Sequence, residues 1–195
     1  MADRTAFSAA VSEVILRRYV RHPTEGTPES GFRLVAVSIP DAAGRGRTVE
    51  QTSWDNWHGR ELRESQQQEL RERYGEGSSE PGSAPTGEDV TVFMVAREFS
   101  GEAVGCGALR QLDETTGEVK RMYVPAEHRG KGISKEILVA LEDHARTLGW
   151  TRLVLETGEL QPEAIGLYSR SGYQRIPNFG AYADEPTSIC FAKDL

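Results

Sequence analysis

The stretch that decides the fold is VPAEHRGKGIS, residues 124–134. It follows the apolar run 118–124, passes through a polar turn into Gly130-Lys131-Gly132 and continues directly into an amphipathic segment. Where a strand, a glycine turn and a helix follow one another, several backbone N–H groups and the positive end of the helix dipole point at one small volume. Glycines are needed there because a Cβ would hold the backbone away from an anion. The pattern predicts a site for a phosphate or diphosphate.

Two better-known phosphate motifs do not fit this stretch. A P-loop requires Gly-x-x-x-x-Gly-Lys-Ser/Thr, which the chain does not contain. A dinucleotide fingerprint requires a third glycine at position 135, where the chain has Lys135. Taken alone, the turn could also be a plain glycine turn with surface charges.

The sequence after the turn predicts two helices and two strands. The first helix begins directly after the turn, because apolar residues with helical spacing form one face there: Ile133, Ile137, Leu138, Leu141, Ala145 and Leu148. Gly149 ends this helix, and a short buried strand is expected at 153–155. A second helix at 162–171 and a last strand at 188–192 complete the chain, with one further strand possible near the end.

The sequence before the turn predicts mostly strands. Apolar runs at 90–96, 103–109 and 118–124 are separated by hairpin-like turns. Upstream of them we expect a strand at 32–39, a polar glycine-rich turn, a helix at 61–74 and a mobile surface loop at 75–89, which is rich in glycine, serine and proline.

The first 30 residues are expected to form a separate appendage. Their apolar stripe predicts a short amphipathic helix within 1–22, which the prolines and glycine at 23–28 end. The main domain is then 31–195, and its order of elements predicts a mixed α/β sheet with helices on both faces.

Composition excludes several classes of protein. The 195 residues carry 23 Lys and Arg against 30 Asp and Glu, a net charge of −7, which argues against nucleic acid and anionic membrane as partners. Cys106 and Cys190 form no disulfide framework and are expected to be buried. We find no membrane span, no signal peptide and, with four scattered histidines, no metal site, so the expected location is the cytoplasm.

Three motifs in order resemble the GNAT superfamily of N-acetyltransferases. Residues 129–134 match its Arg/Gln-x-x-Gly-x-Gly/Ala loop with Ser134 in the last place, 118–124 resemble its fourth strand, and 161–173 resemble its Asn-x-x-Ala…Leu-Tyr…Gly-Phe helix with Gln161 for Asn. The resemblance covers residues 31–195. It implies a mostly antiparallel sheet of six to seven strands flanked by about four helices and splayed between its fourth and fifth strands.

The resemblance implies acetyl-CoA as co-substrate and assigns residues to it. In that family the Met122 N–H would polarise the acetyl carbonyl, while Tyr123 and Val124 hold the pantetheine arm. The remaining residues that would bind the cofactor are Arg129, Gly130, Lys131, Gly132, Ile133, Ser134, Gln161 and Ala164.

Two catalytic roles follow from the same resemblance. Tyr168 would donate a proton to the departing thiolate, and Glu118 would take the proton of the amine, directly or through water. Strand alternation places Glu118 and Met122 on one face. The alternative for Glu118 is an exposed glutamate at a strand end, paired with Lys120 or Arg121.

The acceptor side is assigned to residues 52–73 and 177–182. Aromatic side chains there could form a wall against the acceptor or simply be packed; they are Trp54, Trp57, Phe179 and Tyr182. The resemblance implies an enzyme that moves acetyl to a primary amine of a small molecule or amino acid. A protein or peptide acceptor, or a non-catalytic acyl-CoA sensor, is the alternative, and a homodimer through the N-terminal stripe or the last strands is plausible.

Overall fold

The computed structural model of the chain describes residues 35–37, 46–75 and 81–195. The predicted N-terminal helix and most of the predicted strand at 32–39 lie outside these residues, so the appendage stays a prediction. The strands are β1 (Val35–Val37), β2 (Arg47–Gln51), β3 (Val90–Glu98), β4 (Ala103–Gln111), β5 (Thr116–Tyr123), β6 (Arg152–Gly158), β7 (Gln174–Ile176) and β8 (Ser188–Asp194). The helices are α1 (Trp57–Tyr74), α2 (Ile133–Thr147), α3 (Pro162–Arg170) and the short 3-10 turns η1 (Ala126–His128) and η2 (Gly180–Tyr182).

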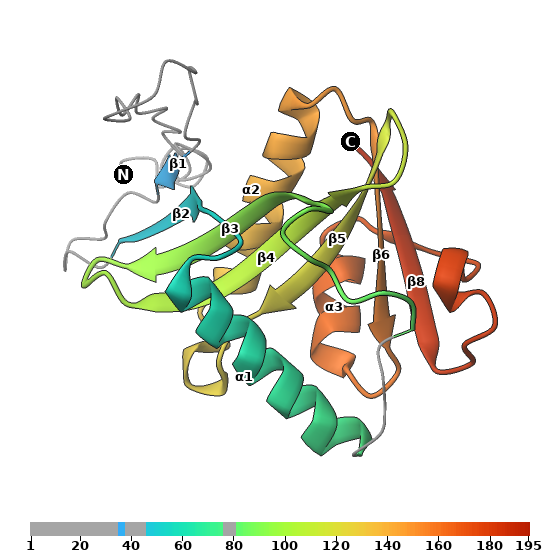
Figure 1. Ribbon diagram of the computed structural model, residues 1–195, viewed down its shortest axis with the longest axis horizontal. Helices are drawn as coiled ribbons and strands as arrows, with labels where there is room; N and C mark the ends of the chain where they lie inside the picture. Colours follow the sequence, from blue (N-terminus) through green and yellow to red (C-terminus); the bar gives the residue numbers. More distant parts are fainter. Residues whose placement is uncertain (1–34, 38–45, 76–80) are drawn as a thin grey trace, which may run out of the picture.

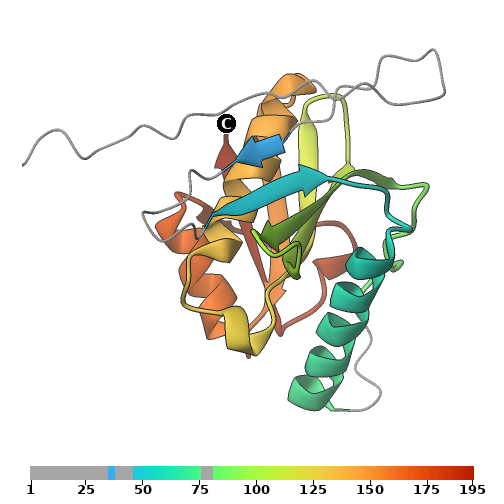
Figure 2. The same ribbon diagram turned by 90° about the vertical axis from the view of Figure 1, so that its left-hand side faces the viewer.

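All eight strands form one sheet, which α1 covers on one face and α2 and α3 on the other (Figures 1 and 2). The larger hydrophobic cluster lies on the face of α2 and α3 and includes Ile137, Leu141 and Phe191. A smaller cluster lies on the α1 face. There, Gly59 lets the helix approach closely, because a Cβ at this position would lie 2.3 Å from the Phe93 ring. Within the described residues, none of the helices combines the length and apolar character that crossing a membrane requires.

Neighbouring strands are antiparallel except at one place. The order across the sheet is β1-β2-β3-β4-β5-β6-β8-β7, and only β5 and β6 are parallel. Residues Thr116–Val119 of β5 pair with Arg152–Leu155 of β6, and beyond these pairs the two strands diverge. Helix α3 lies behind the point of divergence (Figure 1). The predicted fold class, a mostly antiparallel mixed sheet that is splayed in its middle, is confirmed.

The sheet has one strand more than predicted. Strand β2 falls in the segment that the sequence analysis assigned to a polar turn. Its residues, Arg47–Gln51, bury only Val49, so the apolar pattern of a strand is missing. The strand is held by five pairs with β3, from Arg47↔Glu98 to Gln51↔Met94.

A bulge in β5 overturns the predicted alternation of its side chains. Cys106 pairs with Tyr123 and Ala108 with Lys120, so the single residue Gly107 of β4 lies opposite two residues of β5, Arg121 and Met122. Arg121 takes up the extra residue with a φ of 55°, which is rare for a side chain other than glycine. Met122 therefore packs with the cluster under α2, whereas Glu118, across from Arg110, lies on the α1 face.

Helix α1 begins earlier than predicted, whereas the loop after it ends at residue 89 as predicted. Helix α1 begins at Trp57 instead of residue 61, because the Asn56 side chain accepts a hydrogen bond from the Gly59 N–H and caps the helix. The described part of the predicted mobile loop, 81–89, crosses the α1 face of the sheet (Figure 1). Asp89 fastens its end by accepting hydrogen bonds from the Thr86 N–H and hydroxyl.

Candidate active site

The glycine turn before α2 has the geometry of an anion cradle. Gly130 and Gly132 have φ values of 75° and 82°, and Gly132 is the residue that caps α2, without any side-chain hydrogen bond to the helix. A Cβ on Gly130 would meet no atom within 4 Å, and one on Gly132 would meet only a Glu136 oxygen at 4.0 Å. Among the hydrogen bonds of the described residues, the first N–H groups of α2 that donate are those of Lys135 and Glu136, both to Gly132. The preceding N–H groups are left for a ligand.

Two arginines hold this turn in place through hydrogen bonds to backbone carbonyls. The Arg129 Nε donates to the Val124 carbonyl at 2.8 Å, and its guanidinium pairs with Glu69 of α1. Arg47 of β2 donates to the Lys131 carbonyl at 2.8 Å and to Glu136 at 2.7 Å. Sequence reasoning missed Arg47, because it predicted a turn where β2 lies.

The divergence of β5 from β6 begins at Val119 and extends to the cradle. Past Val119, the edge of β5 that faces β6 makes no strand pairs in the described sheet. Met122, Tyr123 and Val124 follow on this edge, and the Met122 carbonyl accepts a hydrogen bond of 3.0 Å from Gln66 Nε2 of α1. This open strand edge can accept an extended ligand that enters from the cradle.

Helix α3 supplies the other predicted cofactor residues. Tyr168 is 5% exposed and belongs to the same hydrophobic cluster as Val124, with Met122 packed against that cluster. Burial, together with the charge of Glu156, raises the pKa of Tyr168 well above its usual value, so its phenol is neutral at physiological pH. Ala164 packs against this cluster, and Gln161 caps the start of α3 with its amide 3.5 Å from the Tyr74 hydroxyl.

Glu118 lies in a buried cluster of charges on the α1 face. The side chain is 0% exposed, so the exposure that the alternative assumed is wrong, whereas its pairing with Lys120 is present. Its carboxylate accepts hydrogen bonds from Arg110 Nε at 3.0 Å and from the Tyr182 hydroxyl at 2.8 Å. Lys120 Nζ donates to that hydroxyl at 2.7 Å and lies 3.8 Å from the carboxylate. Sequence reasoning missed Arg110, although cross-strand pairing with Glu118 places it there.

The four aromatic residues of the predicted wall occupy separate places. Trp54 packs edge-on against Phe93, and Phe179 packs edge-on against Tyr182. Trp57 is 61% exposed and lies against the His58 ring. Among the described ring contacts, none joins the tryptophans to Phe179 or Tyr182.

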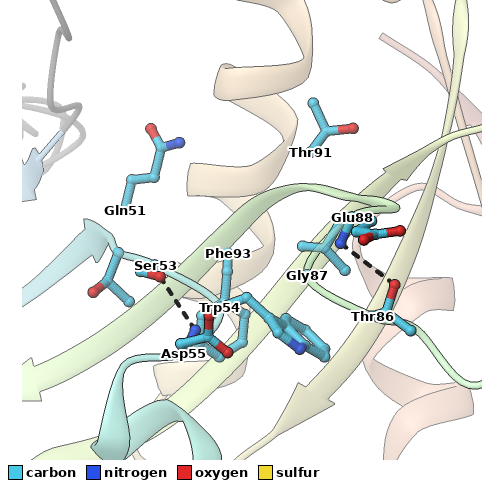
Figure 3. A pocket seen from close by; sticks show the side chains of 11 residues that line it. Gln51, Ser53, Trp54, Asp55, Thr86, Gly87, Glu88, Thr91 and Phe93 are labelled. Atoms are coloured by element: carbon cyan, nitrogen blue, oxygen red, sulfur yellow. Dashed lines mark hydrogen bonds between the residues drawn. The ribbon is translucent and has the colours of Figure 1, made fainter.

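A cavity of about 790 Å³ opens beside Trp54 (Figure 3). It is formed by the segment that joins β2 to α1 and by the segment that leads into β3; its lining includes Gln51, Ser53, Trp54, Asp55, Thr86, Glu88 and Phe93. Its mixture of aromatic and polar groups suits a small polar molecule. No group of three or more His, Cys, Asp or Glu side chains suited to a metal ion gathers in the part of the chain that the structure describes.

With this geometry in place, comparison with known proteins identifies the family. A family model described as the acetyltransferase (GNAT) family matches residues 51–173. The chain therefore belongs to the GNAT acetyltransferase family and is an acetyl-CoA-dependent acyltransferase, as the resemblance implied.

Individual relatives and solved structures support the same family. The chain is 42% identical over 104 residues to an IAA acetyltransferase of Azospirillum brasilense, a match that covers 53% of this chain and 67% of that protein. A solved structure of a predicted acyl-CoA N-acyltransferase from Klebsiella pneumoniae is 33% identical, with a TM-score of 0.65 over 76% of this chain and 97% of that one. A GNAT family acetyltransferase from Elizabethkingia anophelis, solved with acetyl-CoA bound, shares the fold at 17% identity and a TM-score of 0.56, over 76% of this chain and 98% of that one.

Proposed function

We propose that the protein transfers the acetyl group of acetyl-CoA to a primary amine of a small molecule or amino acid, by direct attack in a ternary complex. The observation that carries the proposal is the open glycine cradle at the start of α2, next to the divergence of β5 and β6. The cradle suits a diphosphate, and the unpaired edge of β5 suits an extended arm with amide groups. A thioester held at the far end of such an arm lies within reach of groups on both faces of the sheet.

The cofactor would be held mainly by backbone groups. The N–H groups of the cradle bind the diphosphate, and Tyr123 and Val124 pair with the pantetheine arm. The Met122 N–H donates to the acetyl oxygen, where negative charge develops as the amine attacks. The full set of cofactor residues in this proposal is Met122, Tyr123, Val124, Arg129, Gly130, Lys131, Gly132, Ile133, Ser134, Gln161 and Ala164.

Tyr168 acts as the acid that protonates the thiolate as it leaves. Its position in α3, beside the cluster of Met122 and Val124, supports this role. Its raised pKa supports it as well, because the phenol keeps its proton across the physiological range.

Glu118 acts as the base that receives the proton of the amine. Its carboxylate is oriented by Arg110 and Tyr182 and lies on the α1 face. Because the side chain is fully buried, the proton travels to it through water. The acceptor binds on the α1 side, where Trp54, Trp57, Phe179 and Tyr182 border it.

Two further parts of the proposal concern the setting of the enzyme. We place it in the cytoplasm, where acetyl-CoA is available and where both cysteines, which are free and buried, stay reduced. A homodimer through the last strands or the N-terminal residues stays a prediction.

Thiol release from acetyl-CoA, measured across a panel of amines, tests the function. Glu118→Gln is expected to lower kcat by about 100-fold, within the range for loss of a general base. Glu142→Gln is the matched control, because Glu142 is also a buried carboxylate but pairs with Lys193 of β8 at 2.7 Å. Equal loss in both variants would remove Glu118 from the mechanism.

The same panel separates the alternatives. Faster turnover with peptides than with free amines would indicate a protein or peptide acetyltransferase. Tight binding of acetyl-CoA without turnover on any amine would indicate an acyl-CoA sensor.

A further inference from the structure

The inner surface of α1 carries buried polar atoms that have no partner. Within the described part of the chain, Arg63 Nη1, Gln66 Oε1 and Gln67 Nε2 are enclosed and make no hydrogen bond. Positions 63, 66 and 67 share one side of a helix, because they are spaced by three and four residues. A buried polar atom without a partner destabilises the folded protein and is rare. Three on one side of one helix therefore indicate polar groups that a ligand would supply.

Gln66 joins this surface to Met122, where the proposed function places acetyl transfer. Gln66 holds the Met122 carbonyl through its other side-chain atom, Nε2, at 3.0 Å. One turn earlier, the Arg63 guanidinium lies 3.6 Å from the centre of the Trp54 ring. Arg63 also interacts electrostatically with Arg121, the residue at the bulge of β5.

Two further arginines, Arg60 and Arg121, lie close enough to Arg63 to interact with it electrostatically. Burial lowers the pKa of Arg63, and the neighbouring charges of Arg121 and Arg60 lower it further, while Cys106 and Asp55 oppose them. Among the described residues, Arg63 forms no close ion pair with a carboxylate, and Asp55 acts on it only electrostatically. A half-buried guanidinium that forms no close ion pair suits an anionic group of a ligand.

We propose that Arg63 binds a carboxylate of the acceptor and that Gln66 and Gln67 bind its other polar groups, so that the substrate is an amine that carries a carboxylate, such as a free amino acid. This inference rests on the proposed function and narrows its substrate class. A guanidinium matches a carboxylate with two parallel hydrogen bonds, which fixes the orientation of the acceptor. The amine nitrogen then attacks the acetyl carbonyl carbon, the C–N bond forms, the C–S bond breaks, and one proton passes from nitrogen to Glu118 while Tyr168 protonates sulfur.

The test compares three sets of acceptors: free amino acids, the matching amino acid amides and the matching amines without the carboxyl group. The wild-type protein is expected to favour the acids by 10- to 100-fold in kcat/KM, the range for a hydrogen bond to a charged group. Arg63→Gln is expected to lower kcat/KM for the acids by a similar factor, mainly through KM, and to leave the amides unchanged. Arg63→Lys keeps the charge but cannot form two parallel hydrogen bonds. Its kcat/KM for the acids is expected to lie between the values of the wild-type protein and of Arg63→Gln.

Controls separate this inference from the proposed function. Arg71→Gln, an exposed arginine of the same helix, is expected to change none of the three sets. Equal use of acids and amides by the wild-type protein, or equal loss on both in Arg63→Gln, would overturn carboxylate recognition while leaving acetyl transfer in place. Binding of coenzyme A without turnover in any set would overturn acetyl transfer itself. If Arg63→Gln does not fold, the comparison of acids with amides in the wild-type protein decides alone.

Discussion

Glu118 and Met122 lie on opposite faces of the sheet, although they are four residues apart on β5. A regular strand would place them on the same face, because side chains alternate with a period of two. The bulge at Arg121 shifts the alternation by one residue, so Glu118 joins Arg110 and Tyr182 on the α1 face while Met122 packs under α2. In the proposed mechanism, the proton acceptor thereby lies on the face from which the amine arrives.

The bulge predicts an inverted preference between glycine and alanine. At position 121, the φ of 55° favours glycine, so Arg121→Gly is expected to be more stable than Arg121→Ala by about 1 kcal/mol. At Gln111, an exposed residue of β4 with ordinary φ, glycine is expected to be the less stable of the two. Denaturant unfolding of the four variants measures this, and the same order at both positions would contradict the bulge.

The cradle predicts that one methyl group weakens coenzyme A binding. Gly132→Ala is expected to weaken binding by about tenfold, because the Cβ intrudes where the diphosphate approaches and strains a φ of 82°. Gly101→Ala is the matched control, since Gly101 has a φ of 88° and open space around it but lies in the hairpin between β3 and β4. Both variants should lose similar stability in thermal unfolding, and calorimetry with coenzyme A should separate them. Unchanged binding in Gly132→Ala would remove the cradle from the site.

The two buried tyrosines of the α3 side should behave differently. Tyr168→Phe is expected to lower kcat by about 100-fold with little change in the KM for acetyl-CoA, because it removes a proton donor and keeps the ring. Tyr173, whose ring packs edge-on against Tyr168 at 5.8 Å, is the control, and Tyr173→Phe is expected to keep near wild-type kcat. Steady-state kinetics at pH 7–8 checks both. A Tyr168→Phe variant as fast as the control would exclude the acid role.

The charge cluster predicts that Tyr182 contributes to stability. Tyr182→Phe removes the donor to Glu118 and the acceptor for Lys120, so the free energy of unfolding should fall by about 1–3 kcal/mol. A double-mutant cycle with Lys120→Met measures the coupling, which is expected to be at least 0.5 kcal/mol because the two side chains are in contact. Strict additivity would show that the 2.7 Å contact contributes nothing.

Cys106 predicts a loss of stability at alkaline pH. Burial raises its pKa from 9.0 to about 12 in the folded protein. The unfolded chain therefore releases this proton first, and between about pH 9 and pH 12 the free energy of unfolding falls as the pH rises, by up to about 1.4 kcal/mol per pH unit for one group. The difference between wild type and Cys106→Ala, followed by urea unfolding from pH 8 to pH 10.5, should show this slope. Parallel curves would mean that the thiol ionises equally in both states.

Sequence patterns predicted the parts of the fold that depend on neighbours in the chain. The apolar spacing from Ile133 to Leu148 predicted α2, whose end at Thr147 differs by one residue. The runs at 90–96 and 103–109 predicted β3 and β4. Strand β2 was missed because only Val49 is buried, and the strand depends on its pairing with β3. The predicted burial of Cys106 and Cys190 was correct, since both are free and buried.

The chain sequence by itself determined the glycine cradle, because backbone freedom at Gly130 and Gly132 is a property of the residues themselves. It also determined the order of elements that makes the sheet mixed. Only the tertiary structure decided which side chains face each other. The bulge at Arg121 arises from pairing between β4 and β5, and the contact of Arg63 with Trp54 arises where α1 packs across the sheet. Such contacts join residues far apart in the chain, so no local pattern records them.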